Sequence, residues 1–84
     1  MDLTPQALLA FDTVVRTARN LRIEVKKGCR DERFRMRLFY EVVDPATGAA
    51  AERSVGLVWH EDGAALRELR GRLLERATAA RAVP

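Results

Sequence analysis

Cysteine and histidine are nearly missing from this 84-residue chain, which contains one of each. A lone cysteine, Cys29, excludes a disulfide within the chain and a zinc site built from several thiolates. The sequence also lacks the HExxH, P-loop, GxGxxG and CxxC spacings, so the common metal-hydrolase, nucleotide-binding and dithiol mechanisms lack their parts. We therefore expect no catalytic residue, no metal and no cofactor, and we interpret the chain as a non-enzymatic protein.

Long hydrophobic runs are missing too. The longest early run, Ala7 to Phe11, is far shorter than the roughly 20 residues that cross a bilayer. The first residues, Met-Asp-Leu-Thr-Pro, carry no basic segment, and they do not resemble a secretory signal. We therefore expect no membrane contact and a cytoplasmic location.

The composition is that of a folded protein. Apolar residues make up 48% of the chain and charged residues 32%. The length predicts one domain, residues 1–84, with a modest core. Because so short a chain buries little area, we expect help from self-association, most simply as a homodimer.

Basic residues are unevenly spread. The chain has 15 Lys and Arg against 12 Asp and Glu, a net charge of +3. Residues 16–37 hold nine bases and three acids, hence +6, and the remainder holds six bases and nine acids, hence −3. This uneven distribution of charge bears on which partners the chain binds and not on its fold.

The sequence predicts a first helix that begins after Thr4. Thr4 suits the N-cap and Pro5 the first helical position, while Leu3 and Leu8 occupy hydrophobic-staple positions. Asn20 is the expected stop.

Three segments then alternate between apolar and polar residues, as strands do. They are 21–26, 33–43 and 52–60, separated by a turn at 27–32 and a hairpin loop at 44–48. In the third strand, parity predicts Val55, Leu57 and Trp59 inward, with Val58 and His60 outward. A second helix is expected to begin near Asp62 and run towards Ala82.

The expected fold is therefore α+β, a two-layer α-β-β-β-α domain. Its three-stranded antiparallel meander carries both helices on one face. The other face would present cations beside an aromatic ring, an arrangement that suits single-stranded nucleic acid. The candidate contacts on this face are Arg22, Lys26, Arg33, Arg35, Arg37 and Phe39. The alternative is a merely solvated sheet surface, since Glu24, Glu41 and Glu52 share it.

The stretch 35–74 resembles the Pur-alpha and positive-cofactor-type single-stranded nucleic-acid-binding proteins. The matching pieces are RMRLFYEVVDPATG, ERSVGLVW and HEDGAALRELRGRLLE. The resemblance implies a basic strand, a hairpin, another strand and a helix that supports dimerisation, and it adds Arg53 to the candidate contacts. Those families place more strands before the helix and lack the first helix expected here.

The sequence suggests two other interpretations. The element order is also that of double-stranded-RNA-binding domains, but Glu61 and Asp62 stand where the second helix would have to receive a phosphate. The second interpretation is a protein-interaction or assembly module that docks an acidic protein or a second copy. Leu9, Val58 and Leu74 are the apolar candidates for self-association.

Overall fold

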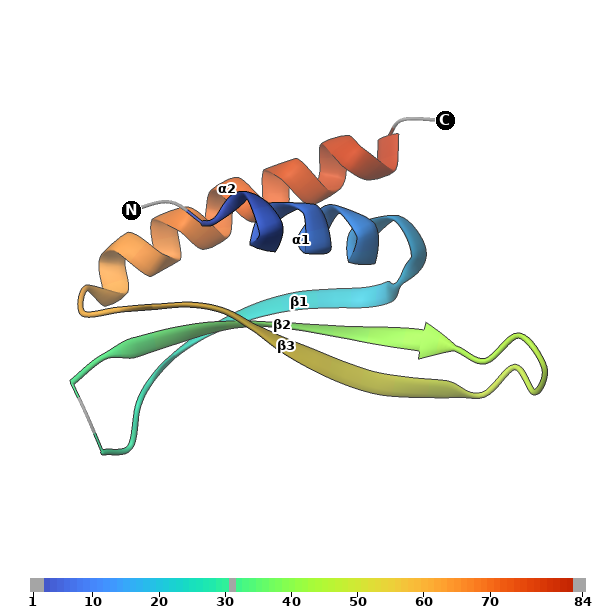
Figure 1. Ribbon diagram of the computed structural model, residues 1–84, viewed down its shortest axis with the longest axis horizontal. Helices are drawn as coiled ribbons and strands as arrows, with labels where there is room; N and C mark the ends of the chain where they lie inside the picture. Colours follow the sequence, from blue (N-terminus) through green and yellow to red (C-terminus); the bar gives the residue numbers. More distant parts are fainter. Residues whose placement is uncertain (1–2, 31, 83–84) are drawn as a thin grey trace.

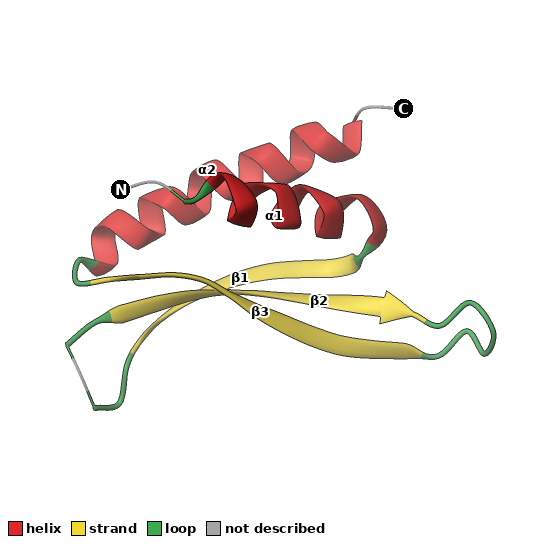
Figure 2. Ribbon diagram, viewed as in Figure 1, coloured by secondary structure: helices red, strands yellow, loops and turns green. Residues whose placement is uncertain are grey.

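The computed structural model describes residues 3–30 and 32–82. The elements follow in the order α1 (Pro5–Thr17), β1 (Arg19–Lys27), β2 (Phe34–Val43), β3 (Ala50–His60) and α2 (Gly63–Ala82). The strands form one antiparallel sheet in the order β1-β2-β3 (Figure 1). Both helices lie on the same side of that sheet (Figure 2). The predicted α+β fold is confirmed. Neither described helix is long and apolar enough to span a membrane.

Helix α1 begins as its sequence predicts. The Thr4 hydroxyl accepts a hydrogen bond from the Ala7 amide at 3.1 Å, which satisfies one of the free N–H groups of the first turn. Pro5 follows at the first helical position. Leu3 is buried and Leu8 is half-buried against the core, as expected of a hydrophobic staple.

Two arginines of α2 tie that helix to α1. Arg76 donates to both carboxylate oxygens of Asp12, from Nε to Oδ1 at 2.7 Å and from Nη2 to Oδ2 at 2.6 Å. Arg81 donates to the carbonyl oxygens of Val15 at 3.1 Å and Ala18 at 2.7 Å. These carbonyls close α1, whose last turn otherwise lacks intrahelical donors. The two helices therefore run side by side in a fixed register (Figure 1).

The core lies between the helices and the sheet. Leu66 and Met36 are fully buried, and Phe11, Val15 and Leu38 are 1% exposed. The remaining buried members of this cluster are Leu3, Ile23, Leu69, Leu73 and Ala77. The apolar side chains of both helices and of the inner sheet face thus form one continuous core.

Strand β1 begins at Arg19, two residues earlier than the sequence predicts, because a bulge between Arg19 and Arg22 lets the strand continue through Asn20. Asn20 adopts a φ of +53°, a left-handed conformation that asparagine tolerates better than most residues. Arg19 lies opposite Glu41, and Arg22 lies opposite Phe39, so two residues of β1 face one of β2. The expected stop at Asn20 is wrong, and the residue instead sits inside the strand.

A second bulge interrupts β3. Met36 lies opposite Val58, but the next residue of β2, Arg37, lies opposite Gly56. Leu57 is therefore an extra residue without a partner on β2. Because side chains alternate along a strand, one extra residue exchanges the two faces for everything beyond it.

The exchange overturns the predicted parity at the end of β3. Trp59 lies opposite Arg35 and is 50% exposed, so it stands on the sheet face away from the helices. Val58 is half-buried and packs against the core, and His60 lies opposite Phe34 on the helix side. The predictions that Trp59 points inward and that Val58 and His60 point outward are wrong because of the bulge at Leu57.

The junction into α2 is built from polar groups. The Asp62 carboxylate accepts hydrogen bonds from the amides of Ala64 at 2.9 Å and Ala65 at 3.4 Å. The Asp62 amide donates to Nδ1 of His60 at 2.9 Å. Asp62 is thus the predicted helix N-cap, and His60 supports the same junction.

Candidate nucleic-acid interface

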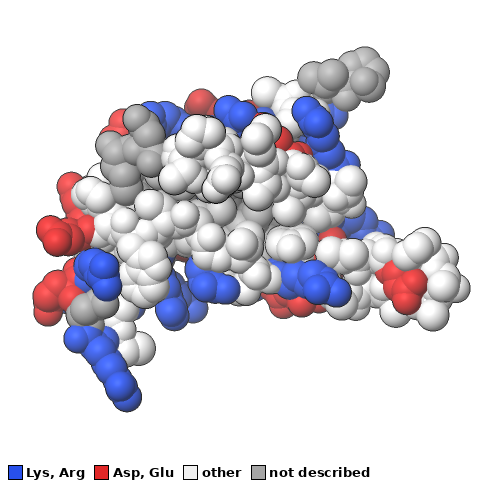
Figure 3. All heavy atoms as spheres, viewed as in Figure 1, with Lys and Arg blue, Asp and Glu red and all other residues white. Residues whose placement is uncertain are grey.

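The sheet face opposite the helices is the candidate interface, and it is called the open face below. No described helix or loop forms a layer over it (Figures 1 and 2). The strand register assigns to it Arg19, Arg22, Glu24, Lys26, Arg35, Arg37, Phe39, Glu41, Glu52, Ser54, Gly56 and Trp59. Five bases against three acids give these residues a net charge of +2. Basic side chains gather along the sheet side of the molecule in Figure 3.

Most of the predicted contact residues do share this face. Arg22 and Lys26 come from β1, and Arg35, Arg37 and Phe39 come from β2. Arg33 precedes β2, and its guanidinium carbon lies 5.3 Å from the centroid of the Trp59 ring, so it borders the same face.

The remaining candidates lie elsewhere. Arg53 lies opposite Tyr40, a residue that packs against the core, so Arg53 lies on the helix side of the hairpin, apart from the open face, and its role as a contact stays a prediction. Val58 is turned towards the core and loses the basis for its role in self-association. Leu9 and Leu74 are 67% and 43% exposed, and both belong to the helix layer.

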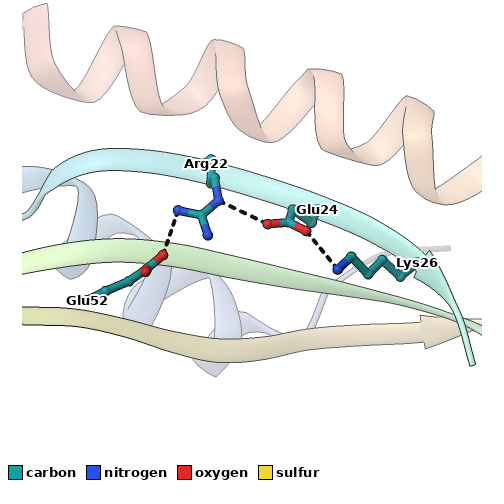
Figure 4. Close-up of polar contacts among 4 residues, drawn as sticks. All are labelled: Arg22, Glu24, Lys26 and Glu52. Atoms are coloured by element: carbon teal, nitrogen blue, oxygen red, sulfur yellow. Dashed lines mark hydrogen bonds and ion pairs between the residues drawn. The ribbon is translucent and has the colours of Figure 1, made fainter.

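In the β1 half of the open face, the basic side chains of Arg22 and Lys26 form ion pairs with carboxylates. Figure 4 shows Arg22 between two carboxylates, with Nε 3.0 Å from Glu24 and Nη1 2.6 Å from Glu52. Lys26 lies 3.4 Å from the other oxygen of Glu24. The hydrogen bond from Arg22 lowers the pKa of Glu24, and Lys26 adds to that shift. The guanidinium of Arg22 also stacks 4.4 Å above the Phe39 ring, so this ring is already covered.

The β2–β3 half differs in its electrostatics. Arg37 donates from Nη2 to the Ser54 hydroxyl at 3.0 Å, and this partner is neutral. Nε of Arg35 is buried and has no hydrogen-bond partner in the described part of the chain. Within residues 3–30 and 32–82, no carboxylate forms an ion pair with either arginine. A buried donor without a partner is costly, and an incoming anion would offer it one if the side chain turned.

Arg35 and Arg37 form the wall between two shallow hollows. The smaller, about 50 Å³, lies towards β1 and is also lined by Glu24, Lys26 and Phe39. The larger, about 140 Å³, lies towards β3. Its lining consists of Arg35, Met36, Arg37, Gly56, Leu57, Val58 and Trp59. The described lining of the larger hollow thus combines two cations and an indole with no acid.

Trp59 is the residue that reasoning from sequence missed. A usable signal was present, because an isolated glycine inside a strand pattern often marks a bulge. Gly56 stands directly before the extra residue Leu57. A parity break placed there moves Trp59 to the open face.

Neither a cluster of metal ligands nor a comparison with known proteins gives further information about this site. In the described residues, no group of three or more His, Cys, Asp or Glu side chains is placed to hold a metal ion. Comparisons with protein-family models, curated proteins and solved structures gave no significant match to the chain. The resemblance to single-strand-binding families therefore stays a prediction.

Proposed function

We propose that this chain is a small binding protein without catalytic activity whose open face binds nucleic acid, chiefly through phosphates. The observation that carries the proposal is the pair Arg35 and Arg37, adjacent on β2 and without a carboxylate partner in the described residues. Guanidinium groups suit phosphate because they are planar, always charged and donate several hydrogen bonds. The cytoplasm, where the thiol of Cys29 would stay reduced, is the expected location.

The charge balance supports a modest, salt-sensitive affinity. Each phosphate that a cation neutralises releases counterions, so affinity falls steeply as salt rises. Arg22 and Lys26 already hold carboxylates at 3.4 Å or less, and they contribute little unless those contacts open. We therefore expect a salt dependence that reflects few phosphate contacts.

The test is fluorescence anisotropy with labelled single-stranded and duplex oligonucleotides at low salt. We expect binding that weakens with added salt and is lost in the double variant Arg35→Glu/Arg37→Glu. The matched control is Arg67→Glu/Arg72→Glu, which makes the same change in net charge on exposed positions of α2. It should bind nearly as the unmodified chain does, because the net-charge effect alone is small beside loss of contacts.

Absence of binding to every oligonucleotide at low salt would show the proposal to be wrong. An equal loss in the α2 control would also contradict it, since binding would then depend on net charge and not on the open face. Circular dichroism of both variants establishes that each is folded.

A second candidate function, an assembly module, is favoured by one observation on β3. The order β1-β2-β3 leaves the 11-residue β3 as an edge strand, and residues 54–59 carry no charge. Charged side chains are a common protection of sheet edges, and β1 has them at Arg22, Glu24, Lys26 and Lys27. Val55, in the uncharged stretch of β3, is 40% exposed.

Self-association through β3 is measured by light scattering over a range of protein concentrations. We expect Val55→Lys to reduce any dimer while leaving oligonucleotide binding intact. A protein that is monomeric at every concentration excludes this candidate. Binding of polyglutamate in place of oligonucleotides would instead indicate an acidic protein as the partner.

A further inference from the structure

The larger hollow of the open face differs from its surroundings in having a ring as well as charge. Trp59 borders this hollow, stands opposite Arg35 and is 50% exposed. The second aromatic residue of the face, Phe39, has the guanidinium of Arg22 4.4 Å above its ring. Trp59 also has a guanidinium nearby, that of Arg33, but its carbon lies farther away, 5.3 Å from the ring centroid. The Trp59 ring is therefore covered less closely than the Phe39 ring.

We infer that the hollow beside the β3 bulge is a binding subsite for one unpaired nucleotide of a single strand. Its base stacks on Trp59, and its phosphate lies against Arg35 and Arg37. The inference rests on the proposed function and restricts it to one part of the open face. It names the residue that selects single strands, since a base inside a duplex cannot leave its stack to meet the indole without an energetic cost.

Steric space supports this position. Gly56 lies opposite Arg37, and a side-chain carbon added to Gly56 would come 3.5 Å from the Arg37 guanidinium. With glycine there, the surface between Arg37 and Trp59 stays low, and the hollow of about 140 Å³ remains. A larger side chain at this position would fill the space in which we place the nucleotide.

Charge excludes the neighbouring hollow from the same role. Glu24 lines the smaller hollow and remains ionised at neutral pH, because contacts with Arg22 and Lys26 lower its pKa. A phosphate there would meet a carboxylate and would have to displace existing ion pairs (Figure 4). The strand is therefore directed to the β2–β3 half of the face.

The bulge at Leu57 is what assembles the subsite. In an unbulged β3, Leu57 would follow Gly56 opposite Met36, Val58 would stand opposite Arg35 on the open face, and Trp59 would stand opposite Phe34 and point at the core. The bulge turns the indole outward next to Arg35 while Val58 packs inward. Bulges that re-aim a side chain are frequent beside functional sites.

The experiment uses the intrinsic fluorescence of Trp59, the single tryptophan of the chain. A short unlabelled oligothymidylate is titrated at low salt, and a duplex of the same length is titrated in parallel. We expect saturable quenching by the single strand, with weaker or no quenching by the duplex. In parallel anisotropy measurements, Trp59→Ala should weaken single-strand binding roughly 5- to 150-fold, the range that stacking of one base supplies.

Three further variants separate stacking from folding and from charge. Trp59→Phe keeps a ring, and it should retain more affinity than Trp59→Ala if the ring stacks. Gly56→Val fills the hollow and should weaken binding, whereas Gly71→Ala, which adds a side chain at an open position of α2, should change it little.

The outcomes distinguish the inference from the function on which it rests. If single strands bind but Trp59 fluorescence does not change and Trp59→Ala binds equally well, the subsite is wrong and the broader function stands. If duplex and single strand bind equally, stacking is not used and the subsite is again wrong. If no oligonucleotide binds, both fall.

Discussion

Asp12 and Arg76 form a two-point ion pair that joins the middle of α1 to α2 across 64 positions of sequence. The hydrogen bond from Arg76 lowers the pKa of Asp12 below its ordinary value of 3.8, against the opposing effect of burial. A carboxyl whose pKa is lower in the folded state stabilises the fold above its unfolded pKa. That contribution disappears as the pH falls through the folded pKa.

The first prediction follows from this sign. Asp12→Asn should lower the melting temperature at neutral pH, and the difference from the unmodified chain should shrink as the pH falls below 3.8. Thermal melts followed by circular dichroism across this range measure the difference. If it is constant at all pH values, the pair acts by shape and not by charge.

The second prediction compares two glycines of α2. Gly71 lies inside the helix with open space where a side chain would go, so Gly71→Ala should stabilise the protein by up to about 1 kcal/mol. At Gly63, the first residue of α2, a side-chain carbon would come 2.9 Å from the Phe34 ring. Gly63→Ala should therefore destabilise by about 1–3 kcal/mol. Urea denaturation gives both free energies of unfolding, and equal effects of the two substitutions would contradict the described packing.

The third prediction concerns the register of β3. Because Trp59 is on the open face near Arg33 and Arg35, iodide should quench its fluorescence efficiently, and more strongly than the cation caesium does. Denatured protein supplies the control, since there the indole is fully accessible. Protection from both quenchers would mean that Trp59 points at the core and that the bulge is absent.

The fourth prediction contrasts a buried and an exposed leucine. Leu66 is fully buried between α2 and the sheet, so Leu66→Ala should cost about 2–5 kcal/mol of stability. Leu9 is 67% exposed, and Leu9→Ala should change stability by no more than about 0.5 kcal/mol. Denaturation at several protein concentrations checks both. A larger, concentration-dependent effect at Leu9 would show that a second copy covers α1.

Much of the fold could be predicted because local chemistry and burial agree along most of the chain. Thr4 and Asp62 cap the helices as their side chains predict. Strict alternation in β2 places Met36 and Leu38 in the core. The register of β2 on β1 then brings Arg22 and Lys26 to the same face as Arg35 and Arg37.

The errors have a common physical origin. Alternation assumes that each residue of a strand has a partner, and a bulge breaks that assumption without changing composition. Leu57 in β3 and the turn of backbone at Asn20 in β1 are the two places where this happens. Counting charges along the sequence could not predict the ion pairs of Glu24 and Glu52 with Arg22, because these pairs depend on which side chains the register brings together.

The hydrogen bonds from Arg81 to the end of α1 have a consequence for the order in which the protein is made. Val15 and Ala18 leave the ribosome early, but the donor for their carbonyls is 66 and 63 positions later. The carbonyls at the end of α1 therefore gain these donors only after the last turn of α2 has been synthesised. Contacts between such distant positions slow folding, so we expect α1 to gain its full stability only when α2 docks against it.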